Sequence, residues 1–257
     1  MMTRLWIMSD LHLEAVAFPE AFKPVPPNFD VLVVAGDVCE GDTDGALRKV
    51  RYFANDKPAV FVLGNHEFWG RDVARERRTA RRSAERHGVV LLDDSVADVA
   101  GLRFVGGTLW AAGALAGDAA TPELPTGEPI RSGNSRRPIT GADEMLLHRQ
   151  TLQVIRNVTA EDGPPLVVVT HHAPHPLCLP KAYRCGWAAG NAASDLSALT
   201  DSGRIAVWVH GHLQHGVDLV RPGGTRIVCN PAGPGFTNPS FQEDRVVAVS
   251  PAPDCKA

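Results

Sequence analysis

The chain has 257 residues, of which 44% are hydrophobic and 21% are charged, as is typical of an ordinary soluble globular protein. Its formal net charge of −3 gives no overall electrostatic reason to expect nucleic acid or an anionic membrane as a partner. The five cysteines are scattered and form no CxxC pair, which argues against a disulfide framework and against a structural zinc site.

The N-terminal residues 1–10 lack the long apolar stretch of a secretory leader, and no apolar run approaches membrane-spanning length. We therefore expect a cytoplasmic protein with no membrane partner. The chain shows no internal repeat and no linker, so we expect residues 1–257 to form one domain.

In the first part of the chain, short apolar runs that end in polar residues alternate with helical patterns. Such runs are typical of buried strands in an α/β sheet. The predicted strands lie at 4–10, 30–37, 59–67, 89–94 and 95–110, the last being a hairpin that turns near Gly101. The predicted helices lie at 42–56, capped by Asp42 or Thr43, and at 71–86, ended by Gly88.

The second part begins with residues 111–140, a stretch rich in glycine, proline and alanine with no clear period. A long loop of this kind inside a domain is usually functional or disordered. The elements predicted after it are a helix at 141–160, strands at 164–172 and 204–212, a short helix at 194–200 capped by Ser194, and a hairpin of 217–224 with 225–231.

Potential metal ligands follow several of the predicted strands. These clusters are Asp10-Leu11-His12, Gly36-Asp37, Gly64-Asn65-His66-Glu67, His171-His172 and Gly211-His212. The carboxyl edge of an open α/β sheet is where ligands bind, so the clusters are expected to meet there. Residues two apart in extended backbone share a face, which would let Asp10 and His12 reach one metal.

Carboxylate, amide and imidazole ligands together suit Mn, Fe, Zn or Ni ions better than Ca²⁺. The clusters offer more ligands than one ion can use. A site for two divalent or trivalent metal ions, roughly 3.5–4 Å apart and bridged by an aspartate, would use all of them.

These clusters, in this order, resemble the motifs of the calcineurin-like metallophosphoesterase superfamily, in its bacterial type. The pattern is D-x-H, G-D, G-N-H-[DE], a histidine after a strand, and G-H-x-H, and it runs from residue 10 to residue 214. The closing segment GGTRIVCNPAG is also similar to bacterial members. The resemblance implies a four-layer α/β/β/α sandwich of two mixed β-sheets flanked by helices.

The resemblance also implies a role for each motif residue. The implied ligands are Asp10 and His12 for the first metal, Asp37 for both metals, and Asn65, His171 and His212 for the second metal. A hydroxide held between the ions would attack phosphorus. His66 would protonate the leaving oxygen or stabilise the phosphoryl charge, so that His66 and Asp37 are the implied catalytic residues.

Gln214 departs from the superfamily pattern, because it occupies the place of the last histidine of G-H-x-H, a ligand of the first metal. Either the Gln214 carbonyl oxygen binds that metal weakly, or His215 replaces it through a local bulge. We favour His171 over its neighbour His172 as ligand, and we expect His210 to support the site from behind.

The implied activity is hydrolysis of a small phosphate ester, a phosphodiester or a phosphomonoester. The alternatives are a metal-dependent nuclease and a non-catalytic binding module of the same fold. Acidic residues interspersed among the arginines of 71–86 favour a solvated helix face over a nucleic-acid contact. Residues 111–140 and 178–187 are candidate substrate walls, with Lys181, Tyr183 and Arg184 as candidate contacts.

Overall fold

The computed structural model describes residues 2–111, 113, 115, 126–133, 137–184 and 187–250. Its first sheet has the strand order β13 (Val246–Val249), β1 (Thr3–Met8), β2 (Val31–Val34), β3 (Ala59–Phe61) and β4 (Val90–Leu91). Strands β1 to β4 pair in parallel, and β13 runs antiparallel to β1. The first sheet is therefore mixed.

The second sheet is also mixed. Its strand order is β11 (Val217–Val220), β12 (Arg226–Cys229), β10 (Ile205–His210), β9 (Leu166–Thr170), β6 (Leu102–Gly107) and β5 (Ser95–Val99). The inner strands β12, β10, β9 and β6 pair in parallel, while β11 and β5 are antiparallel edge strands. Strands β7 (Arg131–Ser132) and β8 (Arg137–Pro138) form a separate small ribbon.

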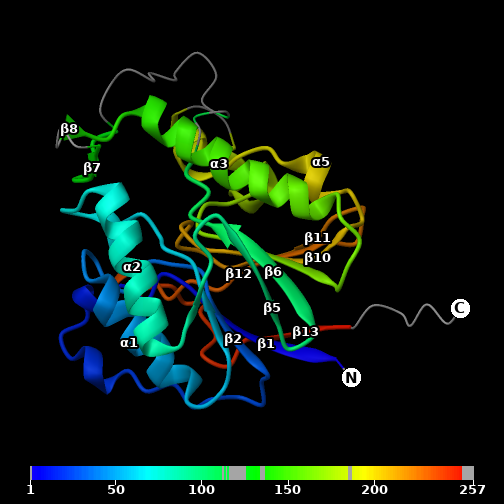
Figure 1. Ribbon diagram of the computed structural model, residues 1–257, viewed down its shortest axis with the longest axis horizontal. Coiled ribbons are helices and arrows are strands. Elements are labelled where there is room, and N and C mark those ends of the chain that lie inside the picture. The colour runs from blue at the N-terminus through cyan, green and yellow to red at the C-terminus, as the bar shows by residue number, and fades with distance from the viewer. Residues whose placement is uncertain are drawn as a thin grey trace, which may run out of the picture.

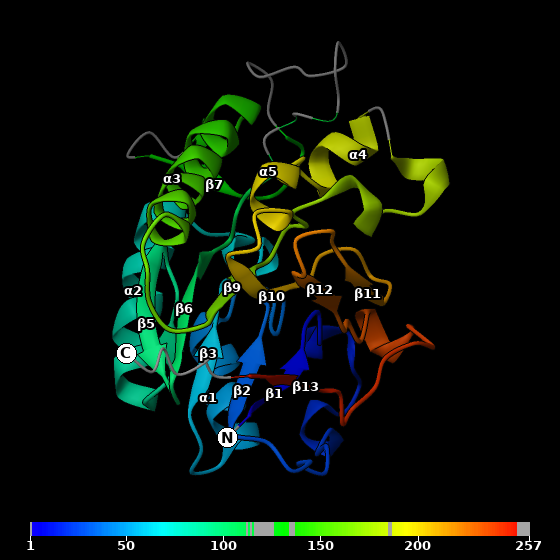
Figure 2. The same ribbon diagram turned by 90° about the vertical axis from the view of Figure 1, so that its right-hand side faces the viewer.

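The helices lie on the outer faces of the two sheets (Figures 1 and 2). They are α1 (Thr43–Ala54), α2 (Val73–His87), α3 (Gly141–Thr159), α4 (Trp187–Ala192) and α5 (Ser197–Thr200). Single-turn helices are η1 (Leu13–Ala15), η2 (Pro19–Ala21), η3 (His66–Phe68), η5 (Pro176–Cys178), η6 (Lys181–Tyr183) and η7 (Pro234–Phe236). None of the helices in the described ranges is long and apolar enough to cross a membrane.

The alternation of side chains along the strands produces three separate apolar clusters. Ile7 of β1 and Val167 of β9 belong to the cluster between the two sheets. Trp6 points the other way and packs in the cluster that includes Leu47 of α1, while Val168 packs in the cluster that includes Ile155 of α3. Three clusters separate four layers, which confirms the predicted α/β/β/α sandwich of two mixed sheets.

Local signals fix most helix ends. The Asp42 carboxylate accepts from the Gly45 N–H at 3.0 Å, so Asp42 caps α1 as predicted. Gly88 ends α2 with a left-handed φ of 63°. The predicted cap at Ser194 is wrong, because α5 begins at Ser197 after Leu196 and makes no side-chain cap hydrogen bond.

Most predicted strands are shorter in the structure than in the prediction. The segment 59–67 is a strand only as far as Phe61, because the chain turns at Gly64 and continues as η3 from His66. Sequence analysis missed β13, which pairs with β1 and is separated from β12 by residues 230–245. Within 111–140, residues 112, 114, 116–125 and 134–136 lie outside the described residues.

Candidate metal centre

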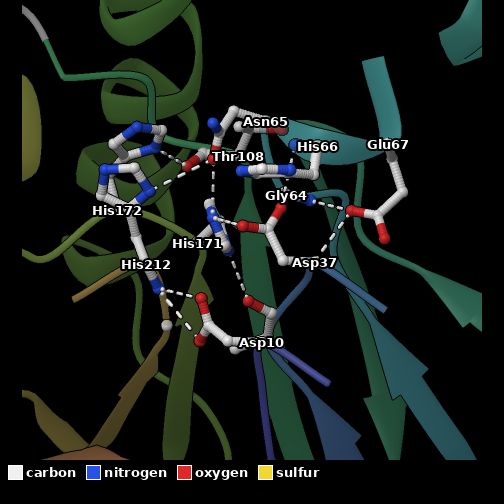
Figure 3. Close-up of polar contacts among 12 residues, drawn as sticks. Asp10, Asp37, Gly64, Asn65, His66, Glu67, Thr108, His171, His172 and His212 are labelled. Carbon is white, nitrogen blue, oxygen red and sulfur yellow. Dashed lines mark hydrogen bonds and ion pairs between the residues drawn. The ribbon is translucent and has the colours of Figure 1, made fainter. Parts of the chain in front are cut away.

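The potential ligands meet at one end of the sandwich, where five parallel strands end. Asp10 follows β1, Asp37 follows β2 and Asn65 follows β3 in the first sheet; His171 follows β9 and His212 follows β10 in the second. Figure 3 shows these side chains turned toward one another around Asp37. The site therefore lies between the carboxyl ends of both sheets, as expected from their parallel strands.

The backbone at the site is not extended. Asp10, His12, Asp37, His212 and Gln214 all have positive φ, of 52°, 42°, 55°, 69° and 55°. Non-glycine residues rarely adopt this left-handed conformation, and its concentration at one place is typical of functional sites. The prediction that Asp10 and His12 share a face through extended backbone is therefore wrong in its reason. Both side chains reach the site because the backbone turns sharply at Asp10 and at His12, not because they alternate along an extended strand.

Glycines allow the strand ends to approach closely. A Cβ on Gly64 would lie 2.0 Å from the Asp37 Oδ1 atom, and a Cβ on Gly211 would lie 2.7 Å from the Asp10 Oδ2 atom. Neither approach is sterically possible for any other residue. The glycines of the G-N-H-E and G-H-x-H segments are thus required by the short distance between the ligand-bearing turns.

Asp37 lies at the centre of the site and is buried. Its Oδ1 accepts from the His66 backbone N–H at 2.9 Å. Its Oδ2 lies 3.1 Å from the His171 Nε2 atom and 3.7 Å from the His12 Nε2 atom, yet it accepts no hydrogen bond from the described residues. A buried carboxylate oxygen without a donor is unfavourable unless a cation satisfies it.

The electrostatics of the site also favour a cation. Burial raises the pKa of Asp37, but the neighbouring imidazoles, His171 first among them, outweigh burial and hold that pKa well below its usual range. Burial lowers the pKa of His171, and the negative charge of the nearby Asp37 carboxylate then raises it to about 10. Burial raises the pKa of Asp10 to about 6. The buried carboxylates thus favour a positive charge beside them.

Two groups of potential ligand atoms share Asp37. Asp10, His12 and Asp37 form the first group; Asp37, His171 and His212 form the second, and the atoms of each group lie within 4.8 Å of one another. The Asn65 Oδ1 atom extends the second group, at 3.0 Å from the His171 Nε2 atom and 3.2 Å from the His212 Nδ1 atom. Oxygen and imidazole donors in this number fit a pair of transition-metal ions.

Gln214 reaches the first group, and His215 does not. The Gln214 Nε2 atom lies 3.1 Å from both the Asp10 Oδ1 and the His12 Nε2 atoms. The His215 ring contacts the carbonyl oxygens of Leu213 and Cys178 at 3.0 and 2.9 Å. Both His215 nitrogens are therefore engaged away from the site, and Gln214 occupies the place of the missing histidine.

His172 and His210 also lie outside the two ligand groups. The His172 Nδ1 atom faces the Thr108 carbonyl oxygen at 3.2 Å, and its ring centroid lies 4.2 Å from that of His212. The His210 Nδ1 atom faces the Gly211 carbonyl oxygen at 2.9 Å, and its Nε2 atom has no partner in the part of the chain described. Burial lowers the pKa of His210 to about 4, so this ring stays neutral.

Two carboxylates support the site: Glu67, which the sequence placed among the potential ligands, and Glu128, which sequence reasoning missed. Glu67 is fully buried and accepts from the backbone N–H groups of Gly64 and Asp37 at 2.7 and 2.9 Å, which fixes the turns at both residues (Figure 3). Its place in the G-N-H-E motif was a signal that could have revealed this role. Glu128 contacts Asn65 from the long 111–140 segment, where no motif marks it.

The candidate substrate contacts lie in the connection between β9 and α4. Tyr183 is 60% exposed. Arg184 donates from Nε to the Leu179 carbonyl oxygen at 2.9 Å. No hydrogen bond joins Lys181, Tyr183 or Arg184 to a ligand residue within the described structure, so their role as substrate contacts stays a prediction.

A four-layer sandwich with aspartate, asparagine and histidine side chains where its parallel strands end defines a class of metal-dependent hydrolases. The chain belongs to the Calcineurin-like phosphoesterase family, whose sequence pattern matches residues 3–216. The match covers every predicted ligand and all strands of both sheets except β11, β12 and β13. None of the curated proteins matches the chain in sequence.

Solved structures with this fold are similar over nearly the whole chain. The phosphopantetheinyl hydrolase PptH from Mycobacterium tuberculosis has a TM-score of 0.68 at 19% identity, covering 100% of this chain and 98% of that one. A dimetal phosphatase from Danio rerio has a TM-score of 0.51 at 14% identity, covering 97% of this chain and 96% of that one. At these identities the similarity establishes the fold.

Proposed function

We propose that the chain is a metal-dependent phosphoesterase that hydrolyses a small phosphodiester or phosphomonoester at the Asp37 site. The observation that carries this proposal is the position of Asp37, which belongs to both ligand groups and keeps a buried Oδ2 atom without a hydrogen bond from the described residues. A carboxylate in that position suits a bridge between two cations.

The remaining ligands divide between the two groups. Asp10 and His12 would hold one ion, and Asn65, His171 and His212 would hold the other, with Asp37 shared. Gln214 would join the first group once its amide turns, because it now faces Asp10 and His12 with Nε2 rather than with its oxygen. Such ions, when bound, polarise the phosphoryl group and activate water. The imidazole-rich donor set supports Mn, Fe, Zn or Ni rather than Ca²⁺.

His66 is the residue we assign to proton transfer. Its backbone N–H is bound to the Asp37 Oδ1 atom, and its ring stacks on Trp69 with centroids 3.9 Å apart. The Glu40 Oε2 atom lies 3.6 Å from its Nδ1 atom. The stacking on Trp69 orients the ring, whose Nδ1 atom has no hydrogen-bond partner among the described residues. The imidazole is therefore available to donate a proton to the leaving oxygen or to hydrogen-bond to the phosphoryl group.

The two alternative functions find less support. The arginines of α2 that would contact a nucleic-acid backbone are partly used elsewhere, since Arg77 and Arg81 pair with Asp93, and Arg86 pairs with Asp44. A binding module would not need so many ligands around a buried shared carboxylate, of which only the last histidine of G-H-x-H is replaced. Both observations favour a small phosphate ester as substrate.

The test is hydrolysis by metal-depleted protein reconstituted with Mn²⁺, Fe²⁺, Zn²⁺ or Ni²⁺. The substrates are bis(4-nitrophenyl) phosphate, 4-nitrophenyl phosphate, single-stranded DNA and, because PptH shares the fold, a phosphopantetheinyl ester. We expect metal-dependent turnover of a small ester that Asp37→Ala abolishes. The proposal is overturned if no small ester is hydrolysed with any metal, or if Asp37→Ala equals the wild type. Cleavage of DNA alone would instead favour the nuclease.

A further inference from the structure

Glu128 connects the long 111–140 segment to two residues of the site. Its Oε1 atom accepts from the Asn65 Nδ2 atom at 3.0 Å, and its Oε2 atom accepts from the Trp69 Nε1 atom at 3.3 Å. Each carboxylate oxygen therefore binds one donor. Glu128 is half-buried, so these hydrogen bonds to a charged acceptor are partly protected from water.

The contact with Glu128 determines which end of the Asn65 amide faces the ligands. Because Nδ2 donates to Glu128, Oδ1 points to the His171 Nε2 atom and the His212 Nδ1 atom. A 180° rotation of the amide would place the NH₂ group toward the second ligand group and the oxygen against the Glu128 carboxylate. The first change is unfavourable because an NH₂ group cannot bind a cation, and the second because two acceptor oxygens repel each other.

The second bond of Glu128 fixes Trp69, whose ring stacks on His66 at an interplanar angle of 24°. The indole N–H and the Asn65 amide are thus held by one carboxylate. Glu128 therefore contacts both Asn65, a candidate metal ligand, and Trp69, on which the His66 ring stacks.

The backbone around Glu128 is itself held in place. The Gly70 N–H donates to the Pro129 carbonyl oxygen at 2.7 Å, and the Arg131 N–H donates to the Arg71 carbonyl oxygen at 2.8 Å. Ile130 is 1% exposed and packs in the cluster under α1 and α2. The segment is therefore anchored beside η3, and Glu128 approaches Asn65 from a fixed position.

We propose that Glu128 is a positioning residue, which orients the Asn65 amide so that its oxygen completes the second ligand group. This inference rests on the proposed function, because it assumes that the second group binds a metal ion. Residues that orient metal ligands typically affect metal affinity by about 10- to 100-fold.

The first experiment is calorimetric titration of metal-depleted protein with Mn²⁺. We expect Glu128→Gln, which keeps the side-chain volume, to weaken the second-group Mn²⁺ by about tenfold and to leave the first-group Mn²⁺ unchanged. The matched control is Glu85→Gln, which removes the same charge from an exposed position of α2 and should change neither Kd. Thermal unfolding monitors the fold of each variant.

The second experiment exchanges the donor and the acceptor. In Asn65→Asp/Glu128→Gln, the new amide can donate to the new carboxylate and still accept from the Trp69 Nε1 atom. We expect Glu128→Gln to weaken second-group Mn²⁺ binding in the wild type but to strengthen it when Asn65→Asp is present. If Glu128 only supported the fold, Glu128→Gln would change Mn²⁺ affinity in the same direction with either residue at position 65.

The outcomes separate the two proposals. If wild-type protein binds two Mn²⁺ ions and Glu128→Gln changes neither Kd, or weakens binding by the same factor with either residue at position 65, the role of Glu128 is overturned and the proposed function stands. If wild-type protein binds fewer than two ions of each of Mn²⁺, Fe²⁺, Zn²⁺ and Ni²⁺ in the same titration, the proposed function fails and the inference fails with it.

Discussion

The two halves of the candidate site share Asp37 but differ in their other donors. The first half offers Asp10, His12 and Gln214, and the second offers Asn65, His171 and His212. The first half thus has one imidazole where the second has two. Each half has one side-chain amide, but Asn65 turns its oxygen toward its group whereas Gln214 turns its Nε2 atom, and an NH₂ group cannot bind a cation. We therefore expect the first half to bind its ion less tightly.

The halves also differ in how their ligands are supported. In the second half, Glu128 fixes the Asn65 amide, and the Ala35 carbonyl oxygen fixes the His171 ring at 2.7 Å from Nδ1. In the first half, His12 is supported by Glu14 at 2.9 Å, while the Gln214 side chain contacts only other ligands among its described hydrogen bonds. We therefore expect two groups of similar side chains to bind their ions with unequal affinity.

Of the substitutions considered, the one at Asp37, which belongs to both halves, is expected to reduce metal binding and activity the most. Asp37→Ala should remove metal from both halves and lower kcat/KM by at least about 10³-fold, because both ions lose their shared ligand. Metal content by mass spectrometry and hydrolysis of an aryl phosphate measure this. As a control, His171→Ala should reduce metal in the second half alone. Retention of one tight ion by Asp37→Ala would show that the carboxylate is not shared.

His66→Ala tests a residue that belongs to neither half. It should lower kcat by about 10²-fold or more, since a positioned proton donor is lost, while both metal affinities stay unchanged. Steady-state kinetics and Mn²⁺ calorimetry on the same sample provide the measurement. A substrate with a good leaving group should be affected less than one with a poor leaving group. Loss of metal by this variant would instead assign His66 to the ligands.

Gln214→His tests whether the missing imidazole weakens the first half, because it gives both halves two imidazoles. The added imidazole should strengthen first-half binding by roughly tenfold, which is about 1.4 kcal/mol. Histidine tolerates the left-handed backbone at this position, where φ is 55°. His215→Ala is the control and should leave both Kd values unchanged. Equal affinity of the two halves before and after Gln214→His would contradict our assignment of Gln214.

The smallest effect concerns the start of α3, outside both halves. Asp143 forms a capping box with Thr140 and pairs with Arg137; the Arg137 hydrogen bond is the main cause that lowers the pKa of Asp143 to about 2. Asp143→Asn should cost about 1 kcal/mol of stability, discounted because Arg137 is exposed. Mn²⁺ affinity should not change. A change in either metal Kd would show that the helix start is coupled to the site.

The pH dependence of this cap follows from linkage. Because folding lowers the pKa of Asp143 from 3.8 to about 2, its contribution to stability is present above pH 4 and is lost as the pH falls toward 2. The difference in Tm between wild type and Asp143→Asn should therefore shrink between pH 5 and pH 2. A constant difference across this range would contradict the cap.

The sequence by itself was sufficient for the fold and the order of the ligand clusters. Continuous apolar runs such as VLVV before Asp37 indicate buried parallel strands, and parallel strands bring their ends to one edge. The motif residues Asp10, Asp37, Asn65, His171 and His212 lie together for that reason. Their roles as ligands, and the organisation of residues 1–257 as one domain, remain predictions.

Only the tertiary structure decided how the ligands are held. The left-handed turns at Asp10 and Asp37 depend on the close approach of neighbouring strand ends, which no local pattern specifies. The contact of Glu128 with Asn65 spans 63 positions, and that of Gln214 with Asp10 spans 204. Local propensity acts over a few residues, whereas these contacts depend on the packing of separate layers, so the sequence indicated the ligands but not their support.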